Sequence, residues 1–264
     1  ALIALERMVG RITTHWVAVS QADRRQGIEW GLFTASKVSV VRPGIDPTAF
    51  AARIESPERD RLRAMLGVAP DQLLVGTVSC LKPQKSPEDF VRVAALVCQR
   101  VPAARCVLVG DGALRPKVEA LLLAQGLQDR VTLLGWRRDV AALLKAFDVF
   151  VLTSQWEGLP CAILEARASR IPIVATRVGG AAEAIVEGIQ GTLCPAGDVR
   201  AMAERVCQIL EDERFRADLR AGTQELPEEF TIQETLKQYQ SLYAYLLHAT
   251  RPSEDVMKLQ PNRL

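Results

Sequence analysis

Hydrophobic positions between residues 73 and 210 follow two alternating patterns. Short apolar, β-branched runs predict six strands, at 73–79, 106–109, 131–134, 149–153, 172–176 and 192–194. Stretches with helical periodicity separate them and predict helices at 87–100, 114–125, 139–146, 160–169, 181–187 and 198–210. Strand–helix alternation with short connections implies right-handed crossovers and a parallel sheet covered on both faces. We therefore predict an α/β fold with a Rossmann-like, doubly wound parallel sheet.

The two ends of the chain show other patterns. The run VAVSQADRRQGI predicts a strand and then a helix capped by serine, and VSVVRPGIDPTAF predicts a strand before a Pro/Gly turn. The stretch FTIQETLKQYQSLYAYLL predicts a strongly amphipathic helix over 231–247. We divide the chain into the end of a preceding α/β domain with a linker (1–48), the Rossmann-like domain (49–230), a closing helix (231–248) and a flexible tail (249–264).

Glycines occur in three loops that follow predicted strands. They are GDG at 110–112, EGLP at 157–160 and VGG at 178–180. Ligands of doubly wound sheets bind at this edge, beyond the carboxyl ends of the strands. Glycine lets backbone amides approach a ligand closely, and a helix N-terminus attracts phosphate. For any single loop, a tight turn explains the glycines equally well.

Two lysines, Lys82 and Lys85, lie in the segment SCLKPQKSPEDF, between a predicted strand and a predicted helix. Ser86 is expected to cap that helix, Pro87 to open it, and acidic residues to occupy its first turn. Lys85 then directly precedes a helix N-terminus, which favours a role as a phosphate ligand. Lys82 can equally well face solvent.

Two glutamates, Glu157 and Glu165, are eight residues apart in EGLPCAILE. Pro160 suits the first position of a helix, so Glu157 is expected in the loop and Glu165 inside the helix. Glu165 has apolar neighbours, and an unpaired carboxylate there would be costly. Its partner is either a set of ligand hydroxyls or a helix salt bridge, for example with Arg170.

Bulk properties narrow the classes of function. Lys and Arg number 33 against 31 Asp and Glu, which argues against a polybasic nucleic-acid surface. The six cysteines include no CxxC pair, so we expect small buried residues in a reducing compartment and no zinc site. No apolar run is long enough to predict a spanning helix. The first residues lack an initiator Met and a signal sequence, so we expect the back part of a longer protein.

Several motifs, in order, resemble the nucleotide-sugar-binding half of retaining GT-B glycosyltransferases of the family 4 type, the glycosyl transferases group 1. These are SCLKPQK, VLVGDGALRPKVEAL, VTLLGW, DVFVLTSQWEGLPCAILEARA, PIVATRVGGAAEAI and GTLCPAGD. Upstream, VAVS and RPGIDPTAF resemble the end of the family's N-terminal domain and its linker. The resemblance implies the C-terminal half of a GT-B fold with a remnant of the N-terminal domain.

The resemblance also implies roles for individual residues. Lys85 would contact the diphosphate of a nucleotide sugar, Glu165 the ribose hydroxyls, and Glu157 the transferred sugar, so Lys85 and Glu157 are the catalytic candidates. The segment Gly135–Arg137 would lie against the nucleobase, and Glu183 would complete the diphosphate and ribose end. The other implied donor-binding residues are Lys82, Gly110, Trp136, Gly158, Leu159, Pro160, Gly179 and Gly180. Trp136 could also be half-buried packing.

The expected partners are a UDP- or GDP-linked sugar donor and a glycan or lipid-linked sugar acceptor, with no nucleic acid. No cofactor and no metal are expected, because the sequence has no Asp-x-Asp and a lysine with helix N-termini can stabilise a diphosphate leaving group. The family likeness implies a cytoplasmic protein, with peripheral association at the inner membrane face through the N-terminal domain.

Two departures from the family pattern leave alternatives open. Cys80 stands where the family commonly has an arginine, so one expected phosphate contact is missing unless Lys82 replaces it. Most of the family's N-terminal domain is also missing from the chain. A donor-binding fragment or split-enzyme subunit without activity of its own is therefore one alternative. A GT-B-type sugar-nucleotide epimerase is another, although the E-x7-E neighbourhood fits the transferases better.

Overall fold

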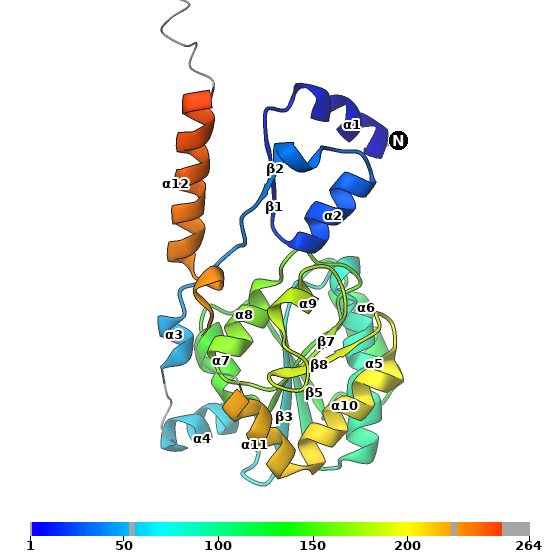
Figure 1. Ribbon diagram of the computed structural model, residues 1–264. Coiled ribbons are helices and arrows are strands. Elements are labelled where there is room, and N and C mark those ends of the chain that lie inside the picture. Colours follow the sequence, from blue (N-terminus) through cyan, green and yellow to red (C-terminus); the bar gives the residue numbers. More distant parts are fainter. Residues whose placement is uncertain (1, 53–55, 223–225, 250–264) are drawn as a thin grey trace, which may run out of the picture.

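The centre of the molecule is a parallel sheet of six strands in the order β5-β4-β3-β6-β7-β8 (Figure 1). The computed structural model describes residues 2–52, 56–222 and 226–249, so the predicted tail, apart from Ala249, lies outside the described residues. The strands are β3 (Leu73–Val78), β4 (Ala104–Val109), β5 (Val131–Gly135), β6 (Val149–Leu152), β7 (Ile173–Thr176) and β8 (Gly191–Cys194).

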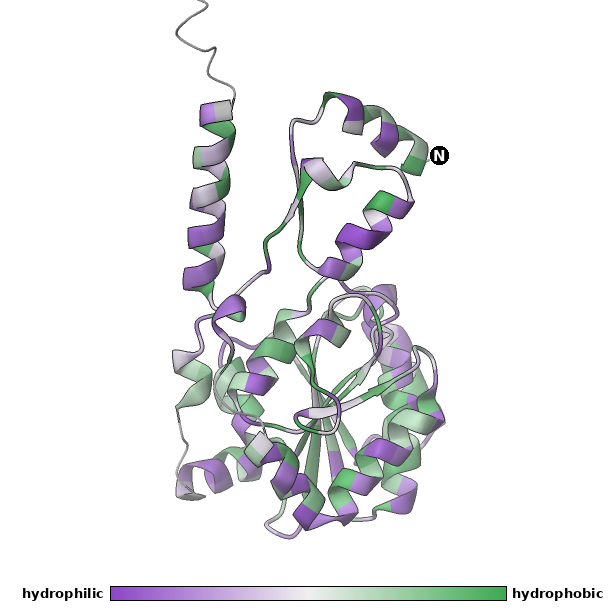
Figure 2. Cartoon of the chain, viewed as in Figure 1, coloured by the Kyte–Doolittle hydropathy of each residue, from purple (hydrophilic) through white to green (hydrophobic). Residues whose placement is uncertain are grey.

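Helices cover both faces of this sheet, because successive side chains of a strand point to opposite sides. Val75 of β3 belongs to the core under α5, α6 and α10, whereas Leu74 belongs to the core under α7 and α8. The strands are accordingly apolar on both sides and mostly green in Figure 2. The helices are α3 (Thr48–Ala51), α4 (Ser56–Met65), α5 (Pro87–Arg100), α6 (Arg115–Ala124), α7 (Val140–Ala146), α8 (Cys161–Ala168), α9 (Ala181–Ala184), α10 (Val199–Glu211) and α11 (Glu213–Gly222). The predicted α/β class with a doubly wound parallel sheet is confirmed.

A smaller N-terminal unit, residues 2–41, precedes the sheet domain. It contains α1 (Leu2–Ile12), β1 (Trp16–Ala18), α2 (Gln21–Glu29), η1 (Ala35–Lys37) and β2 (Val38–Val40), and the two strands pair in parallel. The chain crosses into the sheet domain and returns beside this crossing through η3 (Glu228–Phe230) to α12 (Ile232–Ala249) (Figure 1). The amide of Ile45 donates to Phe230 O, and that of Ile232 donates to Ile45 O, each at 3.0 Å. The domain boundaries predicted from the sequence remain a prediction.

Several local predictions are wrong in detail. Ser86 precedes α5 as predicted, but it adopts a left-handed conformation (φ 44°), and its hydroxyl donates to Asp89 Oδ2 at 2.7 Å instead of capping an amide. Pro160 precedes α8 instead of opening it, because its ψ of 111° is extended. Cys161, expected to be buried, is exposed as the first residue of α8, whereas Cys98, Cys106, Cys194 and Cys207 are buried.

Four helices, α1, α3, α4 and α11, were not predicted, and two of them, α4 and α11, are strongly polar. Their sequences, SPERDRLRAM and ERFRADLRAG, contain few apolar positions and give no clear hydrophobic stripe. Ion pairs with Asp148 hold them on the sheet domain, together with a few apolar side chains such as Leu62 and Leu219.

Candidate functional site

The strand order reverses between β3 and β6. From β3 the chain continues outward through β4 to β5, and it then returns to the other side of β3 and continues through β6, β7 and β8. The loops after β3 and β6 therefore lie side by side at the carboxyl ends of these two neighbouring strands. Ligands of doubly wound sheets bind at such a reversal.

Lys85 and Glu157 form an ion pair between these two loops. Nζ of Lys85 donates to Oε1 of Glu157. Ser154 Oγ donates to the same oxygen at 2.6 Å, and Gln84 Nε2 lies 3.4 Å from Oε2. The Glu157 side chain is 6% exposed and that of Lys85 is 16% exposed, so the attraction is screened less than at the surface. The fold thus brings together the two residues that were predicted to be catalytic.

Hydrogen bonds to backbone carbonyl oxygens hold the two loops against each other. Thr153 Oγ1 donates to the carbonyl oxygens of Lys85 and Ser86, both at 3.0 Å, and the amide of Gln155 donates to Gln84 O at 2.8 Å. Lys85 is therefore fixed in position by the end of β6. Lys82, by contrast, is exposed, and its side chain has no hydrogen bond or ion pair to any residue that the structure describes.

The two glycine loops also touch through their backbones. The amide of Gly180 donates to Gly158 O at 2.6 Å, and Gly179 has a φ of 46°. A Cβ added at Gly179 would overlap the carbonyl oxygen of Glu157. Glycine is needed at Gly179 for both its backbone angle and its close approach to the loop that carries Glu157. Leu159, in the same loop, is buried.

Glu165 lies about one turn into α8 and is partly buried. Within the described ranges, its side chain makes no hydrogen bond or ion pair, and burial raises the pKa of its carboxyl. The alternative of a helix salt bridge is wrong: Arg167 donates to Ala184 O at 2.7 Å and Arg170 is exposed. Cys161 is exposed as a residue, but partial desolvation and the charge of Glu165 raise the pKa of its thiol.

The loops after β4 and β5 meet further along the same edge. The amide of Gly110 donates to Gly135 O at 2.8 Å, and both residues have a positive φ. Trp136 is 70% exposed, so the alternative of half-buried packing is wrong. Arg137 is paired with Asp139 at 2.8 and 2.5 Å. The exposed indole of Trp136 is therefore open to stack on a planar ligand.

The structure does not bring Glu183 into this group. Its carboxylate accepts the amides of Gln21 and Ala22 and is paired with Arg42 at 3.0 Å. Glu183 thus contacts the N-terminal unit.

Sequence reasoning missed two residues of the site, Ser154 and Gln84. Both contact Glu157, one from the end of β6 and one from the residue before Lys85. A hydroxyl and an amide next to the predicted acidic and basic groups were the available signal. Their orientation toward one carboxylate depends on how the two loops pack together.

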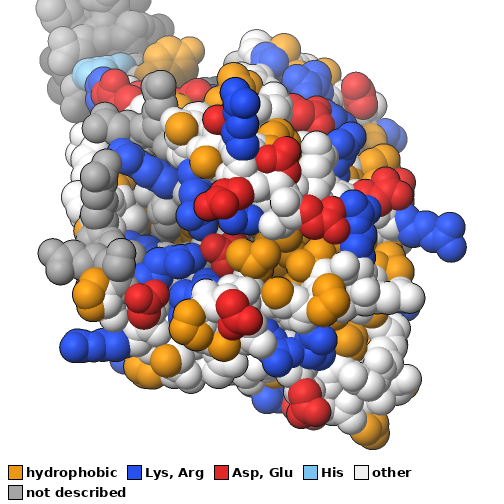
Figure 3. Space-filling model, turned by 90° about the horizontal axis from the view of Figure 1, so that it is seen from below, with side chains coloured by type: hydrophobic (Ala, Val, Ile, Leu, Met, Phe, Trp, Pro, Cys, Tyr) orange, Lys and Arg blue, Asp and Glu red, His pale blue; other side chains and the backbone are white. Residues whose placement is uncertain are grey.

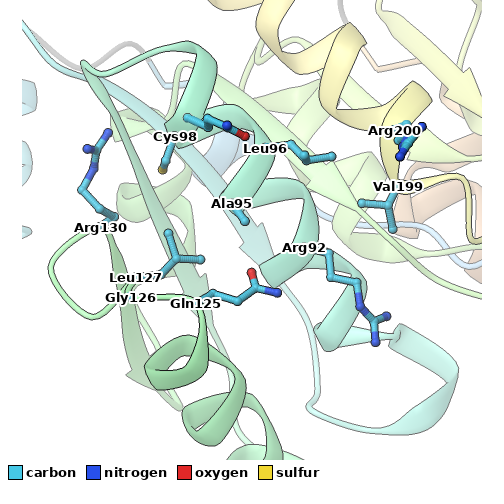
Figure 4. A pocket seen from close by; sticks show the side chains of 11 residues that line it. Arg92, Ala95, Leu96, Cys98, Gln125, Gly126, Leu127, Arg130, Val199 and Arg200 are labelled. Carbon is cyan, nitrogen blue, oxygen red and sulfur yellow. The ribbon is translucent and has the colours of Figure 1, made fainter.

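A cavity of about 690 Å³ lies elsewhere, between α5, the turn after α6 and the start of α10 (Figure 4). It is lined by three arginines, Arg92, Arg130 and Arg200, and by apolar side chains, but it contains none of the predicted site residues. Cys98 opens into it, and a hydrogen bond with Cys106 lowers the pKa of Cys98 to about 7. This cavity contains no residue of the loops that follow β3 and β6.

The described residues contain neither a metal-binding cluster nor a membrane-spanning helix. No group of three or more His, Cys, Asp and Glu side chains is arranged to hold a metal ion there. No described helix combines the length and apolar character that crossing a membrane requires. Figure 3 shows the face at the amino ends of the strands, where basic and acidic side chains are interspersed.

Comparison with known proteins gives a consistent family. A family model described as glycosyl transferases group 1 matches residues 58–226. The UDP-Gal:alpha-D-GlcNAc-diphosphoundecaprenol alpha-1,3-galactosyltransferase of Escherichia coli is 28% identical over 242 residues, which are 90% of this chain and 62% of that protein. The N-acetyl-alpha-D-glucosaminyl L-malate synthase of Bacillus anthracis is 31% identical over 184 residues, 69% of this chain and 48% of that protein. The chain therefore spans between 48% and 62% of the length of these two relatives.

Solved structures with the same fold were also found. The crystal structure of HepE from Anabaena in complex with UDP-glucose matches with a TM-score of 0.79 and 27% identity, over 88% of this chain and 64% of that chain. Sucrose-phosphate synthase from Thermosynechococcus elongatus matches with a TM-score of 0.75 and 26% identity, over 89% of this chain and 58% of that chain.

Proposed function

The chain belongs to the glycosyl transferases group 1 family, and we propose that it binds a nucleoside diphosphate sugar at the loops that follow β3 and β6. The Lys85–Glu157 pair at the strand reversal carries this proposal. A UDP-linked donor is supported by the similar proteins, a UDP-Gal-dependent galactosyltransferase of Escherichia coli and HepE of Anabaena in complex with UDP-glucose. In the whole protein, the sugar passes to a hydroxyl of a glycan or lipid-linked acceptor.

The diphosphate would be held by Lys85 and by helix N-termini. α5 begins two residues after Lys85, and α8 begins four residues after Glu157. The first amides of a helix have no intrahelical partner and attract anions. When the donor arrives, Lys85 exchanges Glu157 for a diphosphate oxygen. The ion pair therefore holds the Lys85 side chain in a defined position until a diphosphate replaces the Glu157 carboxylate.

The two glutamates would bind the two sugar rings of the donor. Once released from Lys85, Glu157 accepts hydrogen bonds from hydroxyls of the transferred sugar, while Ser154 still donates a hydrogen bond to it. Glu165 has a raised carboxyl pKa and no partner in the described part of the chain, and two adjacent ribose hydroxyls would satisfy it. Trp136 would stack on the base.

The reaction we propose is retaining and independent of metal. The bond between the anomeric carbon and the diphosphate oxygen breaks, and the acceptor oxygen bonds to the same face of that carbon. The acceptor proton goes to the leaving diphosphate oxygen. Lys85 and the helix N-termini stabilise the charge that develops on the diphosphate.

Isothermal calorimetry with UDP, GDP and ADP tests donor binding. Lys85→Ala should weaken binding of the preferred nucleotide by about 10- to 100-fold, because a charge-assisted contact is lost. Lys82→Ala is the matched control, since Lys82 is exposed in the same loop, and it should change the affinity by less than about twofold. No nucleotide binding, or equal effects of the two variants, would refute the site.

Products formed from the nucleotide sugar separate the alternatives. Slow release of UDP and free sugar by this chain would indicate a transferase site that uses water as acceptor, and EDTA should leave it unchanged. A sugar nucleotide with altered stereochemistry would favour an epimerase. Binding without turnover would fit a donor-binding module, consistent with the 48–62% of the relatives' length that the chain spans.

A further inference from the structure

We infer that Glu183 is a positioning residue that does not bind the donor. It clamps the N-terminal unit to the two loops that contain Gly158 and Gly180, which we call the donor loops. The inference rests on the proposed function for the identity of those loops. Glu183 is the third residue of α9, directly after the loop that contains Gly179 and Gly180. Its oxygen Oε1 accepts the amide of Ala22 at 2.8 Å, and Oε2 accepts the amide of Gln21 at 3.1 Å.

These two amides are the first of α2, and a helix leaves its first N–H groups without an intrahelical partner. The side chain of the local cap, Ser20, accepts the amide of Asp23 at 3.0 Å and does not reach the amides of Gln21 and Ala22. Glu183 completes the cap from 161 and 162 positions away. A carboxylate is also the favourable charge at the positive end of the helix dipole.

Arg42 joins this contact to the crossing between the two parts of the chain. Its guanidinium is 3.0 Å from Glu183 and 3.3 Å from Glu229, and it lies over the ring of Phe230. Oε2 of Glu183 thus receives two donors, which fills its two lone pairs and leaves little capacity for a ribose hydroxyl.

The clamp lies against the donor loops. A Cβ added at Gly158 would stand 2.6 Å from Val19 Cγ2 and 3.1 Å from Asp23 Oδ2, and one added at Gly180 would stand 2.8 Å from Ser20 Cβ. The start of α2 therefore packs directly on the backbone of both loops. Releasing Glu183 would loosen the wall formed by the N-terminal unit without removing a donor ligand.

Site-resolved amide hydrogen exchange on the nucleotide-free chain tests the clamp. Glu183→Gln should speed exchange of the Gln21 and Ala22 amides by about tenfold or more, because the charged acceptor is lost. Glu187→Gln is the control. Glu187 lies four residues after Glu183 and forms an exposed ion pair with Arg177, so its replacement should leave exchange of both amides unchanged. Unchanged exchange in Glu183→Gln would overturn the inference. Protection of β6 amides in each variant verifies that the sheet domain is folded, and Arg42→Gln provides a second variant with the same expected direction.

Nucleotide binding distinguishes positioning from donor contact. Saturating UDP should slow exchange of the Gln21 and Ala22 amides in the wild type, because UDP binding at the donor loops and packing of α2 on those loops are linked. Glu183→Gln should change UDP affinity by less than about threefold, whereas Glu165→Gln should lower it by about tenfold. A loss in Glu183→Gln as large as that in Glu165→Gln, or UDP binding without added protection of α2, would overturn the positioning role. If the wild type binds no nucleotide, the proposed function fails, while the nucleotide-free exchange still decides whether the clamp exists.

Discussion

Two buried carboxylates stand at opposite ends of β6, and they are held in different ways. Asp148, just before the strand, accepts the amide of Leu74 at 2.8 Å and pairs with Arg63 at 3.0 Å. Arg59 and Arg220 complete its contacts at 2.9 and 3.2 Å. Glu157, beyond the strand, has a lysine, a hydroxyl and an amide as partners, all from loops.

The difference separates a structural cluster from a site that can exchange partners. The guanidinium groups around Asp148 come from α4 and α11, so this carboxylate anchors the two polar helices that the hydrophobic pattern did not predict. Around Glu157 the neighbours are glycine loops and the side chain of one lysine, which an anion can draw away. Burial alone therefore does not distinguish structure from function; the identity of the partners does.

The largest expected effect is on the stability provided by Asp148. Asp148→Asn should lower the free energy of unfolding by about 3–5 kcal/mol, because Arg63 would remain buried without a counter-charge. Urea unfolding measures it. Asp71→Asn, an exposed aspartate shortly before β3, is the control and should stay within about 0.5 kcal/mol. A loss of unfolding free energy as small as that of the control would contradict the structural role of Asp148.

The pH dependence of stability should show the same carboxylate. Burial alone would raise the pKa of Asp148, but the Leu74 amide and the three arginines lower it below its usual value. A lowered pKa in the folded state means that the stabilisation is complete above about pH 3.9 and is lost as the pH falls through the folded pKa. The wild type should therefore lose more free energy of unfolding on acidification than Asp148→Asn does. Parallel curves from urea unfolding at several pH values would contradict this.

The glycine loops at the other end of β6 give the next effect. Gly179→Ala should cost about 1–3 kcal/mol more in unfolding free energy than Gly188→Ala, because its Cβ would overlap Glu157 O. Gly188 also has a positive φ but no atom within 4 Å of an added Cβ, so it isolates the backbone strain. Thermal and urea unfolding of both variants measure the difference. Equal costs would mean that the loops do not need this close approach.

At Glu157 the effect should appear in binding instead of stability. Glu157→Gln should weaken binding of UDP-glucose relative to binding of UDP by about 5- to 10-fold, because only the sugar ring would lose its carboxylate. The free energy of unfolding should fall by about 1 kcal/mol or less, since Ser154 keeps its acceptor. Calorimetry and urea unfolding on the same sample give both numbers. A stability loss comparable to that of Asp148→Asn would place Glu157 with the structural cluster.

The smallest expected stability effect belongs to Glu165. Burial raises the pKa of its carboxyl, so the ionised form is unfavourable in the folded state, and this cost grows as the pH rises through the unfolded pKa. Glu165→Gln should therefore leave the free energy of unfolding at neutral pH unchanged within about 0.5 kcal/mol or raise it slightly. A clear loss of stability in urea unfolding would reveal a structural partner and end its comparison with Glu157.

Much of the fold and part of the site could be predicted from local patterns. The apolar runs gave all six strands of the main sheet within a few residues, and the predicted range 87–100 matches α5. The family resemblance carried by the motifs is confirmed. The resemblance implied the roles of Lys85 and Glu157, and the strand pattern placed both in loops at one edge of the sheet. Arg170 failed as a partner for Glu165 because nearness in sequence does not fix side-chain direction.

The sequence by itself determined the order of strands and helices, the glycine loops and the chemical groups at the sheet edge, because these depend on local periodicity and turn chemistry. Only the tertiary structure decided which charges meet. Asp148 finds its arginines 72 to 89 positions away, and Glu183 caps a helix more than 160 positions upstream. Such pairs produce no periodic pattern in the sequence, since the same charged residue can face water, a ligand or a distant helix.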